Sequence, residues 1–221
     1  MVISTALRNL LYFITISLLP TTTMAHKPKH NDHDHDPNNP FGSPTRHTTT
    51  HDSSTGFAIF APPILIKPQP DPYGSVGMVV HDLYKTFTTP FNMTAESDIS
   101  LLQSHPQQPA GETLWFPSPG ETLVRYCDWA PGQTIDFHRT ETIDFGVVME
   151  GEMELTVGES KQTGEKRLLK KGDVVVQRGT LHAWENLSKT KWSRVVFFLV
   201  GAAPVVVNGE EKGEVLPWSK K

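Results

Sequence analysis

The chain has 221 residues, of which 37% are hydrophobic and 20% are charged, so it is neither a bundle of membrane helices nor disordered throughout. Its formal net charge is −4 and its sequence pI is about 6.2, which gives no basic field that would attract DNA or RNA. We therefore expect one or two domains and no nucleic-acid partner.

The first 25 residues have the pattern of a secretory signal peptide. Arg8 supplies a positive charge ahead of Leu10 to Leu19, a ten-residue apolar run that is too short to span a bilayer. Thr23 to Ala25 then place small residues where a signal peptidase cuts. We predict a signal peptide over 1–25, entry into the secretory pathway or secretion, and no membrane span in the mature chain. An uncleaved anchor or a wrongly assigned start codon is the alternative.

Residues 26–55 are predicted to form a disordered linker rich in His, Pro and Thr. This segment contains one large apolar residue, Phe41, and six histidines, so it cannot bury enough surface to offset the entropy of ordering. The run from His30 to Asp36 (HNDHDHD) could hold a metal ion loosely, although such a tract is more often a solvated tail.

Residues 56–207 are predicted to form one all-β domain, followed by a C-terminal tail over 208–221. Ten prolines lie between Pro62 and Pro119, which excludes long helices and suits edge strands and loops. Between Gly132 and Ala203 there is no proline, and seven strand-length runs rich in β-branched and aromatic residues are separated by turn signals. These runs are TIDFH, DFGVVM, MELTV, KRLLK, DVVVQ, HAWEN and WSRVVFFLV. Such closely spaced strands indicate a sandwich or barrel, and the absence of internal repeats indicates a single one.

Cys127 is the single cysteine of the chain, so no internal disulfide can form and the barrel must depend on packing. Because it lies in a strand-like stretch (LVRYCDW), we expect a small buried residue rather than a reactive thiol.

Several polar residues interrupt the apolar runs at spacings that predict a shared pocket. His138 ends one run, Asp144 follows six positions later, and His182 begins a later run. In extended chain, side chains at even spacing share a face, so His138, Thr140 and Asp144 are expected to point inward together if the strand is not kinked. A return strand carrying His182 could close on the same place.

These residues and the glycines around them resemble the two sequence motifs of the cupin family. The positions that match the first motif are Gly132, His138, Thr140, Asp144 and Gly151, and those that match the second are Gly172, Asp173, Arg178 to Thr180 and His182. Two positions depart from the family pattern, since Thr140 replaces the second His and Asp144 replaces the Glu. We expect the glycines to form turns at positive φ rather than to take part in chemistry.

More narrowly, the stretches HRTETIDFGVVMEGEMEL and GDVVVQRGTLHAWEN are similar to small single-barrel cupins of bacteria and of fungal secondary-metabolite gene clusters. The fungal proteins of this group are described as cupin-domain oxidoreductases. The resemblance implies a single jelly-roll cupin barrel, with a disordered N-terminal tail before it.

The resemblance also implies a site for one divalent transition metal with His138, Asp144 and His182 as its ligands. Two imidazoles and one carboxylate form the ligand set of non-haem iron oxygenases, and the same set could hold Mn, Ni or Zn. Because Asp is one methylene shorter than Glu, Asp144 could instead act as a free catalytic base beside the metal. In the alternative without metal, the two histidines bind or protonate a substrate, as they do in isomerase and cyclase cupins.

Three further residues are candidates for contact with a small-molecule substrate. Thr140 occupies a motif position in the expected pocket. Arg178 replaces the usual turn proline and could clamp a carboxylate or phenolate at the barrel mouth, although a salt bridge on the rim explains it as well. Trp184 lies two residues after His182, so its side chain is expected on the same inward face. It could stack on an aromatic substrate or simply fill the core.

Three functions remain open at this point. The first is a mononuclear-metal oxidoreductase that acts on a small aromatic or polyketide-like metabolite. The second is a metal-free lyase, isomerase or cyclase that uses the same pocket. The third is a secreted barrel that binds or stores a ligand without turnover. A homodimer is a possible assembly for each of them.

Overall fold

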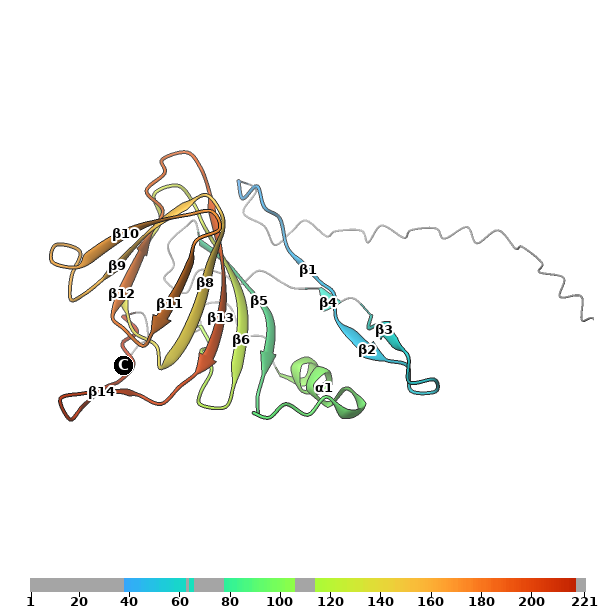
Figure 1. The fold of residues 1–221 in the computed structure, drawn as a ribbon. Helices are drawn as coiled ribbons and strands as arrows, with labels where there is room; N and C mark the ends of the chain where they lie inside the picture. Colours follow the sequence, from blue (N-terminus) through green and yellow to red (C-terminus); the bar gives the residue numbers. More distant parts are fainter. Residues whose placement is uncertain (1–37, 63, 66–77, 106–113, 218–221) are drawn as a thin grey trace, which may run out of the picture. The chain divides into compact units, whose positions relative to one another are not determined.

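The computed structural model describes residues 38–62, 64–65, 78–105 and 114–217 (Figure 1). The predicted signal peptide over 1–25, residues 26–37 of the predicted linker and the last four residues of the predicted tail lie outside the described residues. Among the described residues, no helix has the length and hydropathy of a membrane span.

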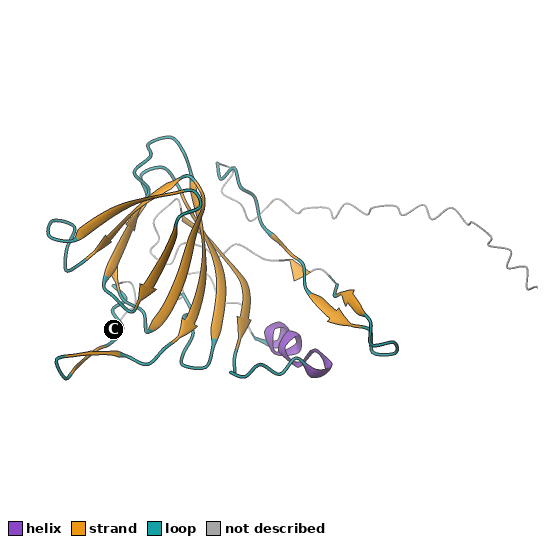
Figure 2. Cartoon of the chain, viewed as in Figure 1, coloured by secondary structure: helices purple, strands orange, loops and turns teal. Residues whose placement is uncertain are grey.

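Two antiparallel sheets carry most of the described strands (Figure 2). The five-stranded sheet has the order β11-β8-β13-β6-β5, and its strands are β5 (Met78–Thr86), β6 (Thr122–Trp129), β8 (Thr142–Glu150), β11 (Val174–Arg178) and β13 (Ser193–Gly201). The four-stranded sheet has the order β10-β9-β12-β7, and its strands are β7 (Thr134–His138), β9 (Glu152–Val157), β10 (Glu165–Lys170) and β12 (His182–Glu185). Each of the seven predicted runs forms a strand, which confirms the all-β fold.

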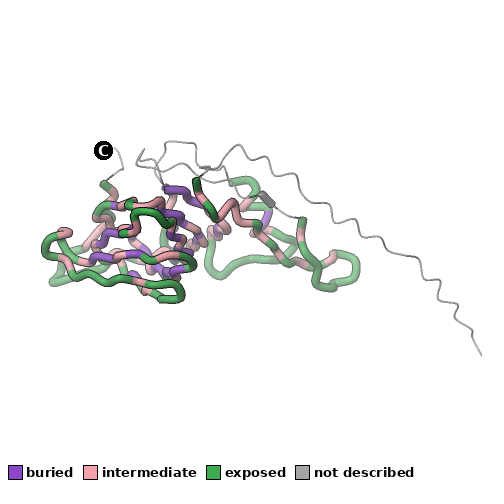
Figure 3. Tube along the Cα trace, turned by 90° about the horizontal axis from the view of Figure 1, so that it is seen from above, coloured by how far each residue is buried: buried purple, intermediate pink, exposed green. Residues whose placement is uncertain are grey.

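The core lies between the inner faces of these two sheets. Along β8 the inward residues, Asp144 and Val148 among them, are buried, whereas Phe145 and Met149 on the opposite face are exposed. One core cluster combines residues of both sheets: Trp129, Val148 and Val195 with Met153, Leu155 and Trp184. Figure 3 shows the buried residues gathered in these strands. Interdigitation of two inner faces is the packing expected of a jelly-roll barrel.

Two of the corners at which the chain crosses between the sheets lie at residues 139–141 and at Gly151. Gly151 has a φ of 74°, and a side chain there would come within 2.8 Å of the Trp192 carbonyl oxygen, so only glycine fits this corner. The other motif glycines, Gly132, Gly172 and Gly179, also have positive φ, as expected. The first corner overturns the expectation that His138 and Asp144 share one unkinked strand, because β7 and β8 belong to different sheets.

The N-terminal segment differs from the predicted disordered linker over residues 38–55. Within it, β1 (Thr45–Arg46) pairs with β4 (Ile64–Leu65), and β2 (Thr49–His51) pairs with β3 (Ala58–Phe60). The Asn39 side chain donates a 2.8 Å hydrogen bond to Asp128 on β6. Order here rests on polar contacts with the barrel, which an argument from apolar content alone does not detect.

Two further segments complete the described structure. A 3-10 turn (Thr94–Glu96) leads into α1 (Ser97–Ser104), which contacts β5 through a 2.5 Å hydrogen bond from the Tyr84 hydroxyl to Asp98. Near the C-terminus, β14 (Val205–Val207) pairs with β15 (Glu210–Lys212), and the backbones of Arg139 and Val215 exchange two hydrogen bonds of 2.9 Å. The described part of the predicted tail over 208–221 is therefore tied to the corner after β7.

Candidate functional site

A pocket lies between the two sheets and encloses about 550 Å³ of empty space counted out to its mouth. Its apolar lining consists of Met78, Leu114, Phe116, Cys127, Trp129, Ile135, Trp184, Phe197 and Leu199. Its polar lining consists of Arg125, His138, Thr140, Asp144 and His182. A mostly apolar and aromatic wall with a few polar groups is typical of a site for a small organic molecule.

Two histidines face each other across adjacent strands of the four-stranded sheet. His138 ends β7, His182 begins β12, and the antiparallel register places them directly opposite each other. Their ring centroids are 4.2 Å apart and their planes meet at 50°. Nδ1 of His138 lies 2.9 Å from the Asp136 carbonyl oxygen, and Nδ1 of His182 lies 2.9 Å from the Thr180 carbonyl oxygen.

These contacts define the protonation of both rings. Because a carbonyl oxygen can only accept, each Nδ1 carries a proton and donates it. Burial lowers the pKa of His138. Burial, followed by the effect of neighbouring His138, lowers the pKa of His182 to about 3. Both imidazoles are therefore neutral near neutral pH, with the lone pair on Nε2.

Asp144 reaches the same pocket from the facing sheet. It lies on β8 between Gln177 of β11 and Leu199 of β13, and only 6% of it is exposed. Its Oδ1 is buried and has no hydrogen-bond partner among the described residues. Burial raises the pKa of Asp144 to about 6, although the Thr142 hydroxyl and the Arg125 charge oppose the rise. A carboxylate in this condition is a candidate base or acid.

A short hydroxyl chain supports the carboxylate. The side-chain oxygens of Thr140 and Thr142 lie 2.7 Å apart, and the Thr142 hydroxyl hydrogen-bonds to Asp144. Because the carboxylate accepts from Thr142, the Thr140 hydroxyl is left to donate to Thr142. Thr140 and Thr142 are both buried, so this chain holds the carboxylate in one orientation.

Arg125 is a pocket residue that the sequence interpretation missed. Only 2% of it is exposed; its Nε donates a 2.6 Å hydrogen bond to Asp82 and its Nη2 donates a 2.9 Å hydrogen bond to the Trp115 carbonyl. Lys85 lies 2.9 Å from the same Asp82. The sequence did contain a signal for it. Arg125, Cys127 and Trp129 are spaced two residues apart along β6, so their side chains share its inner face, and Arg125 is the charged residue among them.

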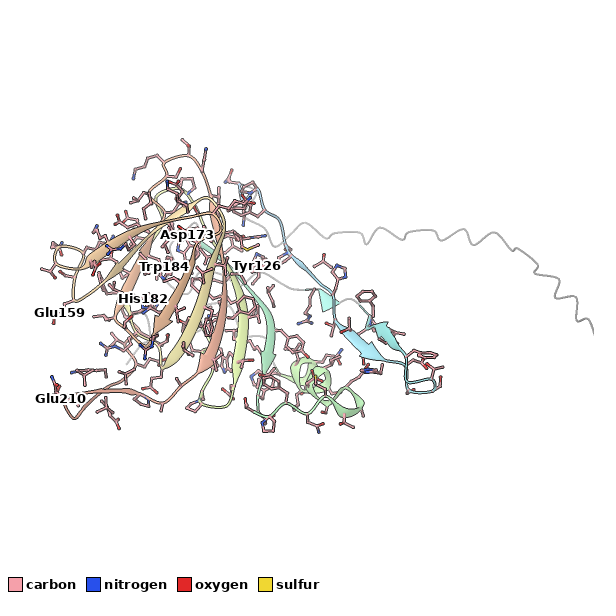
Figure 4. The ribbon with its side chains drawn as sticks, viewed as in Figure 1. Tyr126, Glu159, Asp173, His182, Trp184 and Glu210 are labelled. Carbon is pink, nitrogen blue, oxygen red and sulfur yellow. The ribbon has the colours of Figure 1, made fainter. Side chains whose placement is uncertain are left out.

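Five of the six predicted site residues line the pocket: His138, Thr140, Asp144, His182 and Trp184. Figure 4 shows His182 and Trp184 at successive levels of β12. Trp184 also packs in the core, with its ring centroid 6.3 Å from that of Trp129 and 5.6 Å from that of Phe197. Both roles considered for Trp184 are therefore compatible with its position.

Arg178 is the exception among the predicted site residues. It is the last residue of β11, and its side chain is exposed. Arg178 lies on the same outer face of the strand as Val174 and Val176, whereas the neighbouring Gln177 points inward and is buried. It lines a separate hollow that shares only Thr140 with the main pocket. The expected contact with a substrate at the main pocket therefore does not follow from its placement.

The three predicted metal ligands line the same pocket. Within the described ranges, no three or more His, Cys, Asp or Glu side chains form a group that could hold a metal ion. His138 and His182 meet on adjacent strands, whereas Asp144 projects from the facing sheet. Catalytic metal sites of this kind commonly use three protein ligands. The mononuclear centre that the cupin resemblance implies therefore stays a prediction.

Comparisons with known proteins agree with this fold. Residues 125–198 match the cupin domain family. The chain is 54% identical over 101 residues to oryzines biosynthesis cluster protein J of Aspergillus oryzae, which covers 46% of this chain and 54% of that protein. It is 40% identical over 175 residues to phomopsin biosynthesis cluster protein C' of Diaporthe leptostromiformis, which covers 78% of this chain and 86% of that protein.

A third relative is named as an oxidoreductase. The chain is 30% identical over 171 residues to the cupin-domain-containing oxidoreductase fogC of Aspergillus ruber, which covers 75% of this chain and 76% of that protein. The first two relatives are biosynthesis-cluster proteins of fungi, and the second and third match over most of their length. Together with the two-sheet barrel and its central pocket, these matches establish that the chain belongs to the cupin family.

Proposed function

We propose that the chain is an enzyme of fungal secondary metabolism that binds a small aromatic or polyketide-like molecule in the barrel pocket and transfers protons on it. The observation that carries the proposal is Asp144 Oδ1, a buried carboxylate oxygen in the pocket with no hydrogen-bond partner among the described residues. An unpaired buried oxygen costs free energy, so such a group is retained where a ligand supplies the missing partner.

The pocket lining favours a flat and largely apolar substrate. Trp129 and Phe197 contribute aromatic rings from the five-stranded sheet, Trp184 contributes one from the facing sheet, and Phe116 adds a fourth. Aromatic side chains bind planar rings by offset or edge-to-face contact. The neutral Nε2 atoms of His138 and His182 can accept hydrogen bonds from substrate hydroxyls, which suits a phenol or an enol.

Asp144 is the base in the proposed reaction. Its carboxylate takes a proton from a carbon or hydroxyl of the substrate and returns that proton at a second position, so the net change is an isomerisation or a cyclisation without an oxidant. The hydroxyl chain from Thr140 through Thr142 orients the carboxylate. The two imidazoles hold the substrate hydroxyl while the proton moves, and the apolar lining excludes water.

A metal-dependent oxidoreductase is the second candidate function. One observation favours it: both histidines donate Nδ1–H to a main-chain carbonyl, which is how the ring of a metal-ligating histidine is commonly oriented. The Aspergillus ruber relative, which is named as a cupin-domain-containing oxidoreductase, points the same way. A site for Fe, Mn, Ni or Zn with His138 and His182 would need its third ligand from outside the pair.

The test uses the purified full chain, incubated with an extract of a host that expresses the neighbouring biosynthetic genes. Chromatography with mass spectrometry should show an extract component converted to an isomer of the same mass, formed equally well with and without a strong chelator. Asp144→Asn should slow its formation by about 10² to 10⁴, the usual loss for a general base. Glu141→Gln is the matched control, because Glu141 lies three positions away but outside the main pocket.

The opposite pattern would support the metal-dependent function. Chelation would then stop the reaction, added metal would restore it, and His182→Ala would lose bound metal while Asp144→Asn kept it. A chain that binds an extract component but converts nothing would support the third hypothesis, a binding barrel.

A further inference from the structure

Arg125 places a positive charge in the wall of the barrel pocket. It lies on the inner face of β6, opposite Asp82 on β5 and Phe197 on β13, and its side chain lines the pocket. The Phe116 ring lies beside the guanidinium, with its centroid 5.3 Å from Cζ. Because the guanidinium of Arg keeps its proton in proteins, this wall carries a permanent cation.

The carboxylate beside this cation is shared with a second cation. Asp82 lies 2.6 Å from Nε of Arg125 and 2.9 Å from Nζ of Lys85. At most 9% of each of these three side chains is exposed. Within the described part of the chain, the ion pairs of both cations go to Asp82 alone. The cluster therefore keeps a net positive charge in a buried place, which is costly until an anion compensates it.

The guanidinium has one edge bound to the protein and another that faces no acceptor. Its Nε donates to Asp82, and its Nη2 donates one proton to the Trp115 carbonyl oxygen. The remaining protons lie on Nη1 and Nη2, and no described residue accepts a hydrogen bond from Nη1. These two nitrogens together form the fork that binds a carboxylate through two parallel hydrogen bonds. Arg125 is thus held in place at one edge and open to a planar anion at the other.

A second donor lies on the same strand. Trp129 follows Arg125 by four positions on the inner face of β6, is 2% exposed, and has no hydrogen-bond partner for its buried Nε1 among the described residues. The acceptors of the pocket come from other strands, with Asp144 on β8 and the Nε2 atoms of His138 and His182 on β7 and β12. A ligand that satisfies both groups presents oxygen acceptors toward β6 and a hydroxyl toward the histidines.

We propose that the molecule bound in this pocket is a carboxylic acid, a hydroxylated aromatic or polyketide-like acid whose carboxylate pairs with Arg125. This substrate class rests on the proposed function, which places the substrate in the barrel pocket. A phenolate or an enolate offers one oxygen to the fork, whereas a carboxylate offers two in matching geometry. Arg125 is thus a specificity-determining residue. It disfavours the neutral ester of the same molecule, because a buried cation left without its partner costs binding free energy.

Binding of 3-hydroxy-2-naphthoate and of its methyl ester to the full chain tests the proposal. The two probes share the fused ring and the hydroxyl group and differ in the charge of the carboxyl group. Prior dialysis against a strong chelator removes any metal ion that could itself hold the carboxylate. Equilibrium dialysis should then give a dissociation constant for the acid that is lower than that for the ester by about tenfold or more.

Two variants of Arg125 separate its charge from its fork. Arg125→Met removes the charge, keeps most of the side-chain length and leaves Lys85 to pair with Asp82, so the fold should persist. It should bind the acid no more tightly than the ester, with the affinity for the ester changed by less than about twofold. Arg125→Lys keeps the charge without the fork and should retain a reduced preference for the acid. Arg167→Met is the matched control, because Arg167 is exposed on β10 outside the pocket, and it should keep the full preference.

Circular dichroism and the thermal midpoint check that each variant folds, and Arg125→Lys replaces Arg125→Met if the latter does not. Equal affinity of the unaltered chain for acid and ester overturns the proposal, as does failure of the acid to bind at about 1 mM. A folded Arg125→Met variant that loses affinity for both probes equally overturns it too, since Arg125 would then only shape the pocket. These measurements involve no turnover. A chain that converts no extract component but prefers the acid would lose the proposed reaction and keep the proposed substrate class.

Discussion

Two buried carboxylates on the same five-stranded sheet have opposite surroundings. Asp128 faces outward beneath the N-terminal segment, and Asp144 faces the pocket. Asp128 is fully buried and accepts two hydrogen bonds from Arg194, of 2.6 and 2.7 Å, and one of 2.8 Å from Asn39. His81 lies 3.7 Å from the same carboxylate. Asp144 has the Thr142 hydroxyl as its neighbour and an oxygen without a partner in the described chain.

The pKa values of the two groups move in opposite directions for this reason. Burial alone would raise the pKa of Asp128, but the hydrogen bonds from Arg194 and Asn39, together with the nearby His81 ring, outweigh it and hold the pKa below its usual range. At Asp144 burial dominates and raises the pKa to about 6. A buried carboxylate with all its partners in the protein stabilises the fold, whereas one without them is available to a ligand.

The largest effect is expected from removal of the outer carboxylate. Asp128→Ala leaves the Arg194 guanidinium with no counter-charge in a mostly buried place, so we expect the free energy of unfolding to fall by about 3 to 5 kcal/mol. Urea titration measures the change. Glu150→Ala is the control, because the Glu150–Lys171 pair is exposed on both sides and should contribute nothing measurable. Equal behaviour of the two variants would contradict the structural role given to Asp128.

Removal of the pocket carboxylate should have the opposite sign. Since the folded-state pKa of Asp144 is about 6 and that of the unfolded chain is about 3.9, ionisation of Asp144 costs stability above about pH 6 and nothing well below about pH 4. Asp144→Asn should therefore raise the free energy of unfolding by about 2 kcal/mol near pH 7.5. The gain should shrink as the pH falls toward about 4.

Paired urea titrations at the two pH values measure this change. Asp128→Asn is the matched comparison, because the pKa of Asp128 is lowered and its contribution is present at neutral pH and lost on acidification. Asp144→Asn would contradict the comparison if it destabilised the chain at both pH values, since Asp144 would then be a structural group like Asp128.

The strands and most pocket residues could be predicted from the sequence, because the alternation of inward and outward residues that marks a strand is visible within the strand itself. The runs from TIDFH to WSRVVFFLV show which stretches are strands, and the cupin motif positions at His138, Asp144 and His182 show which residues meet in the pocket. The arrangement of those three could not be predicted in this way. It depends on the corner at residues 139–141, which moves Asp144 to the other sheet.

Other failures of sequence interpretation have the same origin. Arg125 becomes a pocket residue only because Asp82, from a strand 43 positions away in sequence, neutralises it. Residues 38–55 become ordered only because polar groups of the barrel bind them. In both cases the partner is distant along the chain, so no local pattern of hydrophobicity or charge contains the information.

The smallest effect is expected where the N-terminal segment contacts Asp128. Asn39→Ala removes one hydrogen bond to the Asp128 carboxylate but leaves both bonds from Arg194, so we expect a loss of about 1 to 2 kcal/mol. Asn92→Ala is the control, because the Asn92 side chain is exposed and accepts a hydrogen bond within its own loop. In the Asp128→Ala background the effect of Asn39→Ala should disappear, since the acceptor is gone; a double-mutant cycle measures this coupling. If Asn39→Ala cost as little as Asn92→Ala, the segment before β1 would contribute no stability through Asp128. Its polar contact with the barrel would then have to be the 3.0 Å hydrogen bond that the Gly42 carbonyl accepts from Arg194.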